Sequence, residues 1–156
     1  MPKLAIIQFP GSNCIRETAA VLEYVNCDYK IVRWNQAHLL KEMAGIIIPG
    51  GFSYQDRIRA GIIAASLPIS DQIKAAGLEG KPVLGICNGC QVLAETDLIP
   101  QFSQAPSKKL ALDHNRLNNQ AMGFLCDWQY VKLSQSNSCV FTQGLPEDLA
   151  IPVPIN

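Results

Sequence analysis

The sequence predicts an α/β fold: a doubly wound, mostly parallel sheet with helices on both faces and an antiparallel extension after residue 120. Three observations predict it. Short apolar runs alternate with segments of helical periodicity, as in successive βαβ units. Residues 44–48 are continuously apolar, which is typical of a parallel strand covered on both faces. Beyond Pro100 the chain is first polar and then alternates apolar with polar residues, which indicates antiparallel strands.

The first strand and helix are predicted within residues 3–28. Residues 3–9 (KLAIIQF) form an apolar run that ends at Pro10-Gly11, which predicts a buried strand closed by a turn. Ser12 or Asn13 is expected to cap the helix that follows. The apolar residues of this helix recur at helical spacing, at Ile15, Ala19, Leu22 and Val25.

The next two strands are predicted at residues 29–34 and 44–48, and the second of them stops at Pro49-Gly50-Gly51. Residues 56–76 have a helical pattern. Because Pro68 lacks a backbone N–H donor, it is expected to kink or split this helix.

The remaining elements follow the same logic. Residues 81–86 predict a fourth strand, and a helix is expected from Asn88 onward. Residues 101–120 are polar and loop-like, and residues 124–133 (FLCDWQYVKL) alternate enough to predict a strand of the antiparallel extension.

Length and composition indicate a single domain spanning residues 1–156. The 13 Lys and Arg balance the 13 Asp and Glu, so neither nucleic acid nor an anionic membrane is an expected partner. The apolar runs are too short to cross a bilayer and no leader pattern opens the chain, so the protein is expected to be soluble and cytoplasmic. A chain of this length needs no disulfide framework, and its six cysteines are expected to stay reduced.

The stretch PVLGICNGCQVLA, residues 82–94, places a cysteine between two glycines where a strand meets a helix. Gly85 and Gly89 flank Cys87 in a G-x-C-x-G pattern, the counterpart of the G-x-S-x-G nucleophile elbow. In such an elbow the nucleophile sits on a strained turn that leaves no room for large neighbours. The backbone N–H of the next residue, Asn88, would point toward the thiolate and stabilise an oxyanion. The pattern therefore predicts that Cys87 is a nucleophile.

Three other interpretations of this stretch fit the residues less well. A zinc site needs four ligands, yet neither His38 nor His114 has a ligand-spaced neighbour and the other cysteines stand alone. Cys87 and Cys90 fit a thioredoxin-like redox pair, since a helix N-terminus stabilises a thiolate, but that interpretation leaves the two glycines unexplained. A buried core cysteine is disfavoured by the strand–turn–helix context.

An elbow needs a second oxyanion donor, and Pro49-Gly50-Gly51 is the candidate. It follows the neighbouring strand at the edge of the sheet where ligands collect in open α/β folds. A plain turn and a phosphate cradle are the alternatives, and the second is weak because no Gly-rich phosphate motif follows.

With Gln91 four residues after Cys87, the elbow GICNGCQVL resembles the class I (triad) glutamine amidotransferases. Three further stretches resemble the glutaminase subunits of phosphoribosylformylglycinamidine synthase, a family of purine biosynthesis: PGSNC (10–14), PGGFSYQDRIRAG (49–61) and FLCDWQYVKL (124–133). The resemblance covers essentially the whole chain and implies a flavodoxin-like sheet of the class I amidotransferase type. One difference is Gln55, where the family usually has Gly.

The resemblance implies a reaction in which Cys87 attacks the side-chain amide of glutamine and water releases glutamate from the thioester. Gly51 and Asn88 would supply the oxyanion N–H groups, and the glutamine pocket would be lined by Gly50, Phe52 and Gln91. Ammonia would pass to a synthetase subunit, with or without a small accessory subunit, that uses ATP to make formylglycinamidine ribonucleotide. This chain has no nucleotide-binding motif, so no cofactor or metal is expected in it, and ATP and Mg²⁺ are expected on the partner.

The general base is the largest departure from the family, which takes it from a His followed two residues later by a Glu. No H-x-E occurs here, and His38 and His114 are both expected to lie away from the thiol. Residues 149–156 (LAIPVPIN) resemble the strand that leads into the family's histidine, so the domain is expected to be incomplete at its C-terminus. The chain as given is therefore expected to be nearly inert as a glutaminase.

Two alternatives to a glutaminase stay open. A protein of the DJ-1 type superfamily also carries a cysteine on an elbow after a strand, but it would not need Gln91 or the PGSNC stretch. A catalytically dead amidotransferase domain, kept as a binding or assembly module, would account for the missing H-x-E. Glutamine-dependent thioester formation separates these hypotheses.

Overall fold

The computed structural model describes residues 2–100 and, beyond them, residues 110, 112, 115–117, 120, 121, 123, 125–133, 139–146 and 148–155. The chain divides into two compact units, residues 1–112 and residues 113–156. Each unit is described by itself.

The first unit is built on a four-stranded parallel sheet with the strand order β2-β1-β3-β4. The strands are β1 (Leu4–Gln8), β2 (Tyr29–Arg33), β3 (Gly45–Ile48) and β4 (Val83–Gly85). Ile6 of β1 lies opposite Ile31 of β2 on one side and Ile47 of β3 on the other. The four strands predicted from the sequence are confirmed: three have slightly shorter bounds, and β4 has half of its predicted length.

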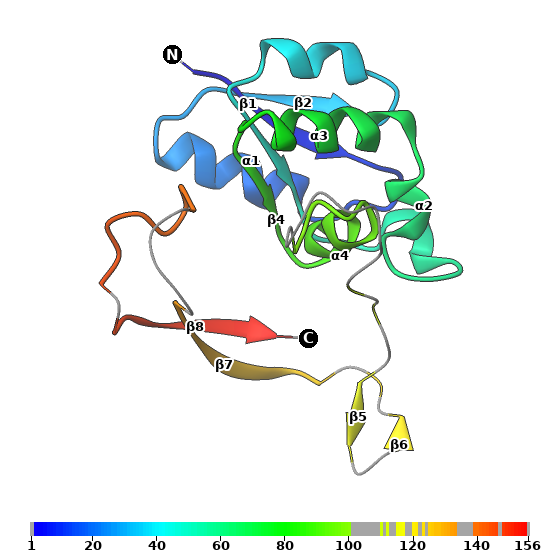
Figure 1. The fold of residues 1–156 in the computed structure, drawn as a ribbon, viewed down its shortest axis with the longest axis vertical. Coiled ribbons are helices and arrows are strands. Elements are labelled where there is room, and N and C mark those ends of the chain that lie inside the picture. The colour runs from blue at the N-terminus through cyan, green and yellow to red at the C-terminus, as the bar shows by residue number, and fades with distance from the viewer. Residues whose placement is uncertain are drawn as a thin grey trace. The chain divides into compact units, whose positions relative to one another are not determined.

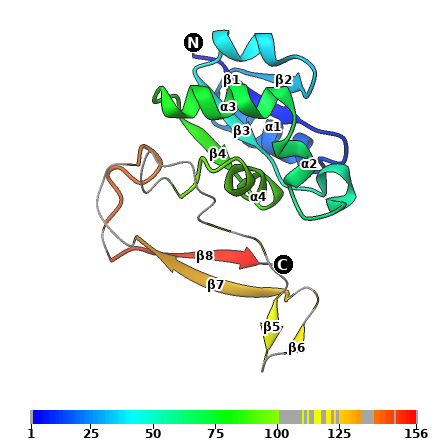
Figure 2. The ribbon, with the colours of Figure 1, turned by 45° about the vertical axis from the view of Figure 1, so that its right-hand side comes forward.

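Helices cover both faces of this sheet, as predicted (Figure 1). On one face, α1 (Ile15–Tyr24) packs its buried side chains against Ile6 and Ile47. On the other face, a larger core joins Ile7 and Ile48 to α2 (Ile62–Ala65), α3 (Pro68–Leu78), α4 (Asn88–Glu95) and the 3-10 helix η1 (Ala37–Glu42). Figure 2 shows α1 and α3 on opposite sides of the strands. This alternation follows from the pleat, which sends successive strand side chains to opposite faces.

The predicted helix over residues 56–76 is correct only in its second part. Pro68 splits the segment and is the first residue of α3, where a missing N–H costs nothing and the fixed φ suits a helix start. The prediction is wrong for residues 57–61, which are not helical. A short 3-10 segment, η2 (Ser53–Asp56), precedes them.

The predicted cap of α1 is also wrong. Cys14 occupies the N-cap position and no side chain caps the helix. The Ser12 Oγ instead accepts a hydrogen bond from the Phe9 N–H at 3.1 Å, and the Asn13 N–H donates to the Gly50 carbonyl at 3.2 Å. Ser12 thus closes the turn after β1, and the Asn13 backbone joins this loop to the loop after β3.

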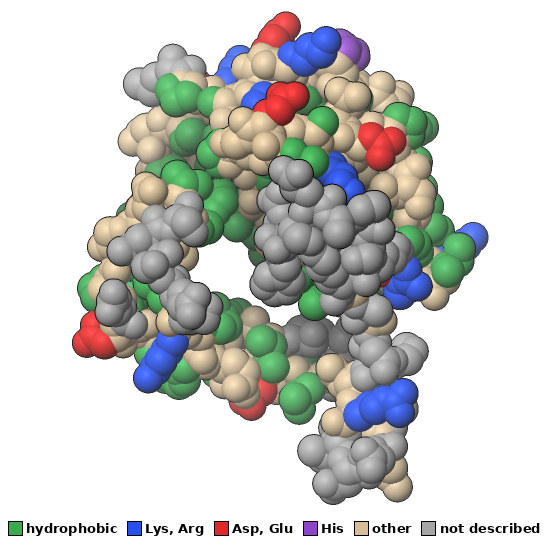
Figure 3. Space-filling view, in the orientation of Figure 1, with side chains coloured by type: hydrophobic (Ala, Val, Ile, Leu, Met, Phe, Trp, Pro, Cys, Tyr) green, Lys and Arg blue, Asp and Glu red, His purple; other side chains and the backbone are tan. Residues whose placement is uncertain are grey.

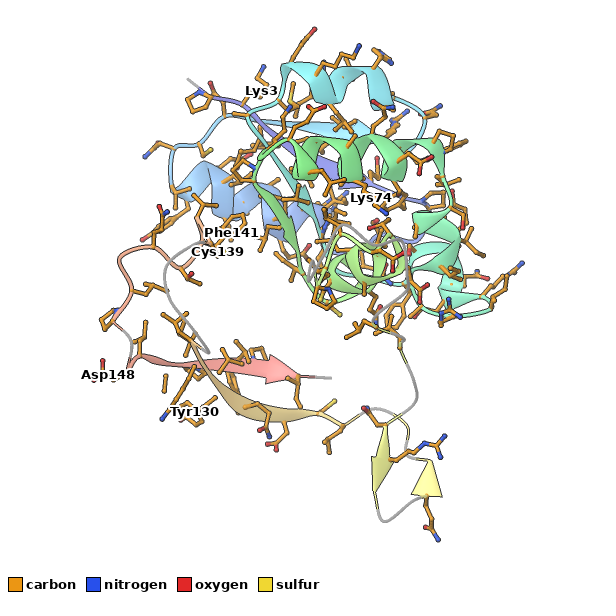
Figure 4. The ribbon with its side chains drawn as sticks, viewed as in Figure 1. Lys3, Lys74, Tyr130, Cys139, Phe141 and Asp148 are labelled. Atoms are coloured by element: carbon orange, nitrogen blue, oxygen red, sulfur yellow. The ribbon has the colours of Figure 1, made fainter. Side chains whose placement is uncertain are left out.

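The residues described in the second unit form two antiparallel pairs, which confirms the antiparallel extension. The pair β5 (Arg116–Leu117) and β6 (Gln120–Ala121) is short, whereas β7 (Asp127–Lys132) and β8 (Ala150–Ile155) pair along their whole length. Tyr130 lies opposite Pro152, is 71% exposed and projects from β7 (Figure 4). Most of the predicted polar stretch 101–120 lies outside the described residues.

Within the described part of the chain, no helix combines the length and the apolar character needed to cross a bilayer. Acidic and basic side chains are interspersed on the face that Figure 3 shows, without a broad region of one sign. All six cysteines are free thiols.

Candidate active site

The candidate site lies where the strand order reverses, at the carboxyl ends of β1 and β3. Helix α1 leaves β1 toward one face of the sheet, while the segment after β3 leads to the helices on the other face. Such a switch point is where open α/β sheets bind ligands. Here the loop after β1 packs on the loop after β3. Ser12 and Gly51 form an isolated antiparallel bridge, and the Phe52 N–H donates to the Gly11 carbonyl at 2.9 Å.

Cys87 follows β4 and occupies the N-cap position of α4 with φ 52° and ψ −113°. A positive φ is strained for a residue with a Cβ, and it turns the exposed thiol away from the core. The flanking glycines make this turn possible. A Cβ on Gly85 would lie 2.7 Å from the Gly89 carbonyl carbon, and a Cβ on Gly89 would overlap the Ile48 carbonyl oxygen. The local geometry is therefore that of a nucleophile elbow.

The Pro49-Gly50-Gly51 turn lies beside this cysteine. A Cβ built on Gly50 would lie 3.4 Å from the Cys87 Cβ and 3.5 Å from the Cys14 Sγ, so these three residues are neighbours. No described residue accepts a hydrogen bond from the N–H of Gly51 or of Asn88. Two backbone donors next to the thiol are thus available to a developing negative charge.

The remaining predicted residues lie around the same turn. Gln91 is half-buried one helical turn after Cys87, and Phe52, 49% exposed, precedes η2. The Asn88 side chain is buried, and its Oδ1 accepts a hydrogen bond from the Ser53 N–H at 3.1 Å. Its Nδ2 donates to the Asp56 Oδ1 at 3.3 Å and to the Gln91 Oε1 at 2.9 Å.

Sequence reasoning gave Asn88 a backbone role only and missed this side-chain network. The bond between Ser53 and Asn88 joins residues 35 positions apart, through a turn whose backbone the sequence does not reveal. Tyr54, Gln55 and Asp56 have φ of 54°, 60° and 52°, the left-handed region that disfavours residues with a Cβ. Only the Asn-Gly pair after Cys87 hinted at a polar contact here.

This left-handed turn and the residue before it carry one buried and one half-buried polar group, Ser53 and Asp56. The Ser53 hydroxyl is buried without a hydrogen-bond partner among the described residues. Burial raises the pKa of the Asp56 carboxyl above its usual range. A strained turn with under-satisfied polar groups is typical of functional sites rather than of loops that only connect elements.

A bidentate ion pair fixes the far end of the same loop. Arg59 donates from Nε and Nη2 to the two Glu95 carboxylate oxygens at 2.5 and 2.6 Å. The Glu95 side chain is only 2% exposed and the Arg59 side chain is 38% exposed, so the pair joins the loop to the last residue of α4 through a buried carboxylate and a guanidinium that reaches solvent.

The second cysteine of the pair, Cys90, lies on the same helix. Burial, and next the charge of Cys87, raise the pKa of the Cys90 thiol, so Cys90 is the poorer nucleophile of the two. Within the described residues, no three His, Cys, Asp or Glu side chains gather into a set that could hold a metal ion.

Neither histidine is placed at the thiol. His38 is exposed on η1, which packs against α3 and β2, and β2 is the edge strand opposite to β4. His114 lies outside the described residues.

Comparison with known proteins adds a family to this geometry. The family described as the CobB/CobQ-like glutamine amidotransferase domain matches residues 1–155. The chain is 39% identical over 155 residues to the phosphoribosylformylglycinamidine synthase subunit PurQ of Methanopyrus kandleri, covering 99% of this chain and 62% of that protein. It is 37% identical to the PurQ subunit of Pyrococcus horikoshii, covering 99% and 62%.

Among solved structures, PurLQS from Thermotoga maritima contains a similar chain. The two superpose with a TM-score of 0.77 at 32% identity, covering 99% of this chain and 65% of that one. The chain thus spans a little over three-fifths of the length of these relatives.

Proposed function

This chain belongs to the family of CobB/CobQ-like glutamine amidotransferase domains, and on that premise we propose that it is the glutaminase subunit of a phosphoribosylformylglycinamidine synthase. It hydrolyses glutamine to glutamate and ammonia through a thioester on Cys87, and the ammonia serves the synthesis of formylglycinamidine ribonucleotide in purine biosynthesis. The observation that carries the proposal is the exposed thiol on a strained turn, beside two backbone N–H groups for which no described residue is an acceptor.

The first chemical step is acyl transfer. The Cys87 thiolate attacks the side-chain carbonyl carbon of glutamine, and the N–H groups of Gly51 and Asn88 stabilise the oxyanion of the tetrahedral intermediate. Collapse of the intermediate breaks the C–N bond, and ammonia leaves once its nitrogen has gained a proton. Water then attacks the thioester carbon, which releases glutamate and restores the thiol.

The pocket follows from the residues around the thiol. Gly50 leaves open the space beside Cys87, Phe52 supplies an exposed aromatic face, and Gln91 offers a carboxamide one helical turn away. None of the described residues at this site is a histidine, and we assign the general base to none of them.

The partner is a synthetase subunit that receives the ammonia, with or without a small accessory subunit, because the relatives are named as subunits and one neighbour is a PurLQS assembly. We place ATP and Mg²⁺ on that partner, since this chain contains no phosphate-binding motif. A cytoplasmic location is part of the proposal, and the six free thiols fit a reducing compartment.

The proposal is tested by trapping the acyl-enzyme. The protein, expressed from its whole reading frame here and in every assay below, is mixed with the synthetase and glutamine, quenched in acid and digested. The Cys87 peptide is searched for a γ-glutamyl adduct while free glutamate is measured. We expect the adduct on Cys87, its loss in Cys87→Ser, and its retention in the matched control Cys90→Ser. Glutamate release with no adduct, or an adduct on Cys90, would contradict the assignment. Tight binding to the synthetase with neither adduct nor glutamate would favour the binding-module alternative.

A further inference from the structure

The side chain of Asn88 joins three parts of the site through hydrogen bonds, and the proposed reaction gives this side chain no role. It is 3% exposed and contacts the Ser53 N–H, the Asp56 carboxyl and the Gln91 carboxamide through the three hydrogen bonds given above. A buried carboxamide with every polar atom engaged is held in one orientation.

The direction of these hydrogen bonds is set by the backbone. The Ser53 N–H can only donate, so the atom that faces it must be the Asn88 oxygen. The Asn88 Nδ2 therefore faces Asp56 and Gln91 and donates to both. Because Gln91 receives a donated hydrogen, the atom that it turns toward Asn88 must be its oxygen.

This arrangement leaves the Gln91 Nε2 pointing away from Asn88, with both of its hydrogens available. No described residue accepts a hydrogen bond from it. Gln91 lies one helical turn after Cys87, and its backbone N–H donates to the Cys87 carbonyl at 3.2 Å. One helical turn rises about 5.4 Å, which is comparable to the length of a glutamine molecule between its two ends.

We propose that Asn88 is a positioning residue that fixes the polarity of Gln91, so that Gln91 presents N–H donors to the α-carboxylate of the bound glutamine. The inference rests on the proposed function. The side-chain carbonyl of glutamine is already met by the N–H groups of Gly51 and Asn88, and the α-carboxylate is the acceptor that remains for a donor one turn away. Asn88 itself contacts the substrate only through its backbone.

Reversing the polarity of the network tests the proposal. In the double variant Asn88→Asp with Asp56→Asn, the new carboxylate still accepts from the Ser53 N–H, and the new carboxamide at 56 donates to it. Gln91 must then turn its Nε2 toward position 88 and its oxygen toward the substrate. The double change avoids two facing carboxylates, which could unfold the turn in Asn88→Asp alone.

The readout is a preference ratio that a purely structural role would not change. With the synthetase present, kcat/KM is measured for glutamine and for glutamine α-amide, whose terminal carboxylate is replaced by an amide that can donate. We expect the wild type to prefer glutamine, and the double variant to lower this preference on the order of ten- to a hundredfold, mainly through KM for glutamine. The single variant Asp56→Asn keeps the original polarity, since the amide oxygen at 56 still accepts from Asn88, and should keep the wild-type ratio.

The outcomes separate this inference from the function on which it rests. If the wild type hydrolyses glutamine and the double variant, folded by its thermal transition, keeps the wild-type ratio, the positioning role of Asn88 is wrong while the glutaminase proposal stands. If the wild type with its partner hydrolyses no glutamine, both fall. If Asp56→Asn alone shifts the ratio as far as the double variant does, the carboxylate at 56 and not the polarity of Gln91 selects the substrate, which also overturns the inference.

Discussion

Gly50 and Cys87 are direct neighbours, so a methyl group added at Gly50 would just touch the side chain of Cys87. A Cβ at Gly50 would be 3.4 Å from the Cys87 Cβ, whereas one at Gly51 would meet the Gly11 carbonyl oxygen at 2.8 Å and the backbone of Asn13 closer still. Gly51 also has φ 140°, which a side chain disfavours. The two glycines therefore serve different ends: one leaves space beside the thiol, and the other allows two loops to meet.

Gly50→Ala is expected to keep the stability within about 1 kcal/mol while lowering kcat/KM for glutamine about tenfold or more, because the methyl group narrows the approach to the thiol. Gly51→Ala should lower the free energy of unfolding by at least about 2 kcal/mol. Chemical denaturation and glutamate release measured on both variants check this. If the two variants lose the same unfolding free energy, Gly50 has only the structural role of Gly51 and no role of its own beside Cys87.

Cys87 is expected to be alkylated well before Cys90, because the pKa of the Cys90 thiol is raised by burial and by the charge of Cys87. Limiting iodoacetamide at neutral pH followed by peptide mapping measures the order of labelling. In Cys87→Ser the nearby negative charge is absent, so the pKa of Cys90 should fall and its labelling rate should rise severalfold. Preferential labelling of Cys14 or Cys126 would count against the elbow.

Several elements were predictable because one local pattern decided them. The run of residues 44–48 could only be a strand covered on both faces, and β3 is buried at every residue. The spacing of Gly85, Cys87 and Gly89 likewise specified a turn that only small neighbours allow, and the structure has it.

Two of the failures concern residues whose partners are distant in sequence. Asn13 has the right chemistry for a helix cap, but it donates its N–H to Gly50 across the loop pair, so a tertiary contact overrides the local preference. The left-handed turn at Tyr54–Asp56 contains no glycine, so the sequence does not indicate its positive φ values. It is held from outside by Asn88, and no window of sequence around residue 55 contains that residue.

Stability should depend on pH through Asp56. Burial raises the pKa of its carboxyl in the folded state, so the folded chain binds this proton more tightly than the unfolded chain. Below the ordinary pKa of a carboxyl group, Asp56 is protonated in both the folded and the unfolded state, and no charge is buried. As the pH rises through the raised pKa, Asp56 loses its proton in the folded state as well, and burial of the charge lowers the free energy of unfolding. The gain in Tm of Asp56→Asn over the wild type should therefore be larger at pH 7 than at pH 3, by differential scanning calorimetry. A gain independent of pH would mean that the carboxyl is not penalised by burial.

Replacing only one partner of the ion pair between Arg59 and Glu95 should lower the thermal stability more than replacing both. Arg59→Met leaves the buried Glu95 carboxylate without its guanidinium and is expected to lower Tm by several degrees. Replacing both residues with Met removes the buried charge as well and should recover part of the loss. The double-mutant cycle, measured by thermal unfolding, gives the coupling between them. Additive losses would mean that the two side chains do not depend on each other.

Replacing Gln55 with Gly should stabilise the protein because of the backbone conformation at this position. It has φ 60° and ψ 26°, a conformation that costs a residue with a Cβ roughly 1–2 kcal/mol and costs Gly nothing in strain.

Gly loses more backbone entropy on folding, by about 0.5–1 kcal/mol, so Gln55→Gly is expected to raise the free energy of unfolding by about 0.5–1 kcal/mol in urea denaturation. The hydrogen bonds that Gln55 accepts from Arg57 are exposed and should subtract little. Gly80 provides the control of opposite sign. It has φ 93° and nothing within 4 Å of its missing Cβ, so Gly80→Ala adds strain without a clash and should destabilise by about 1 kcal/mol. If Gln55→Gly destabilises while Gly80→Ala behaves as expected, the backbone at residue 55 is not left-handed in solution, and the turn that carries Ser53 and Asp56 to Asn88 must be built differently.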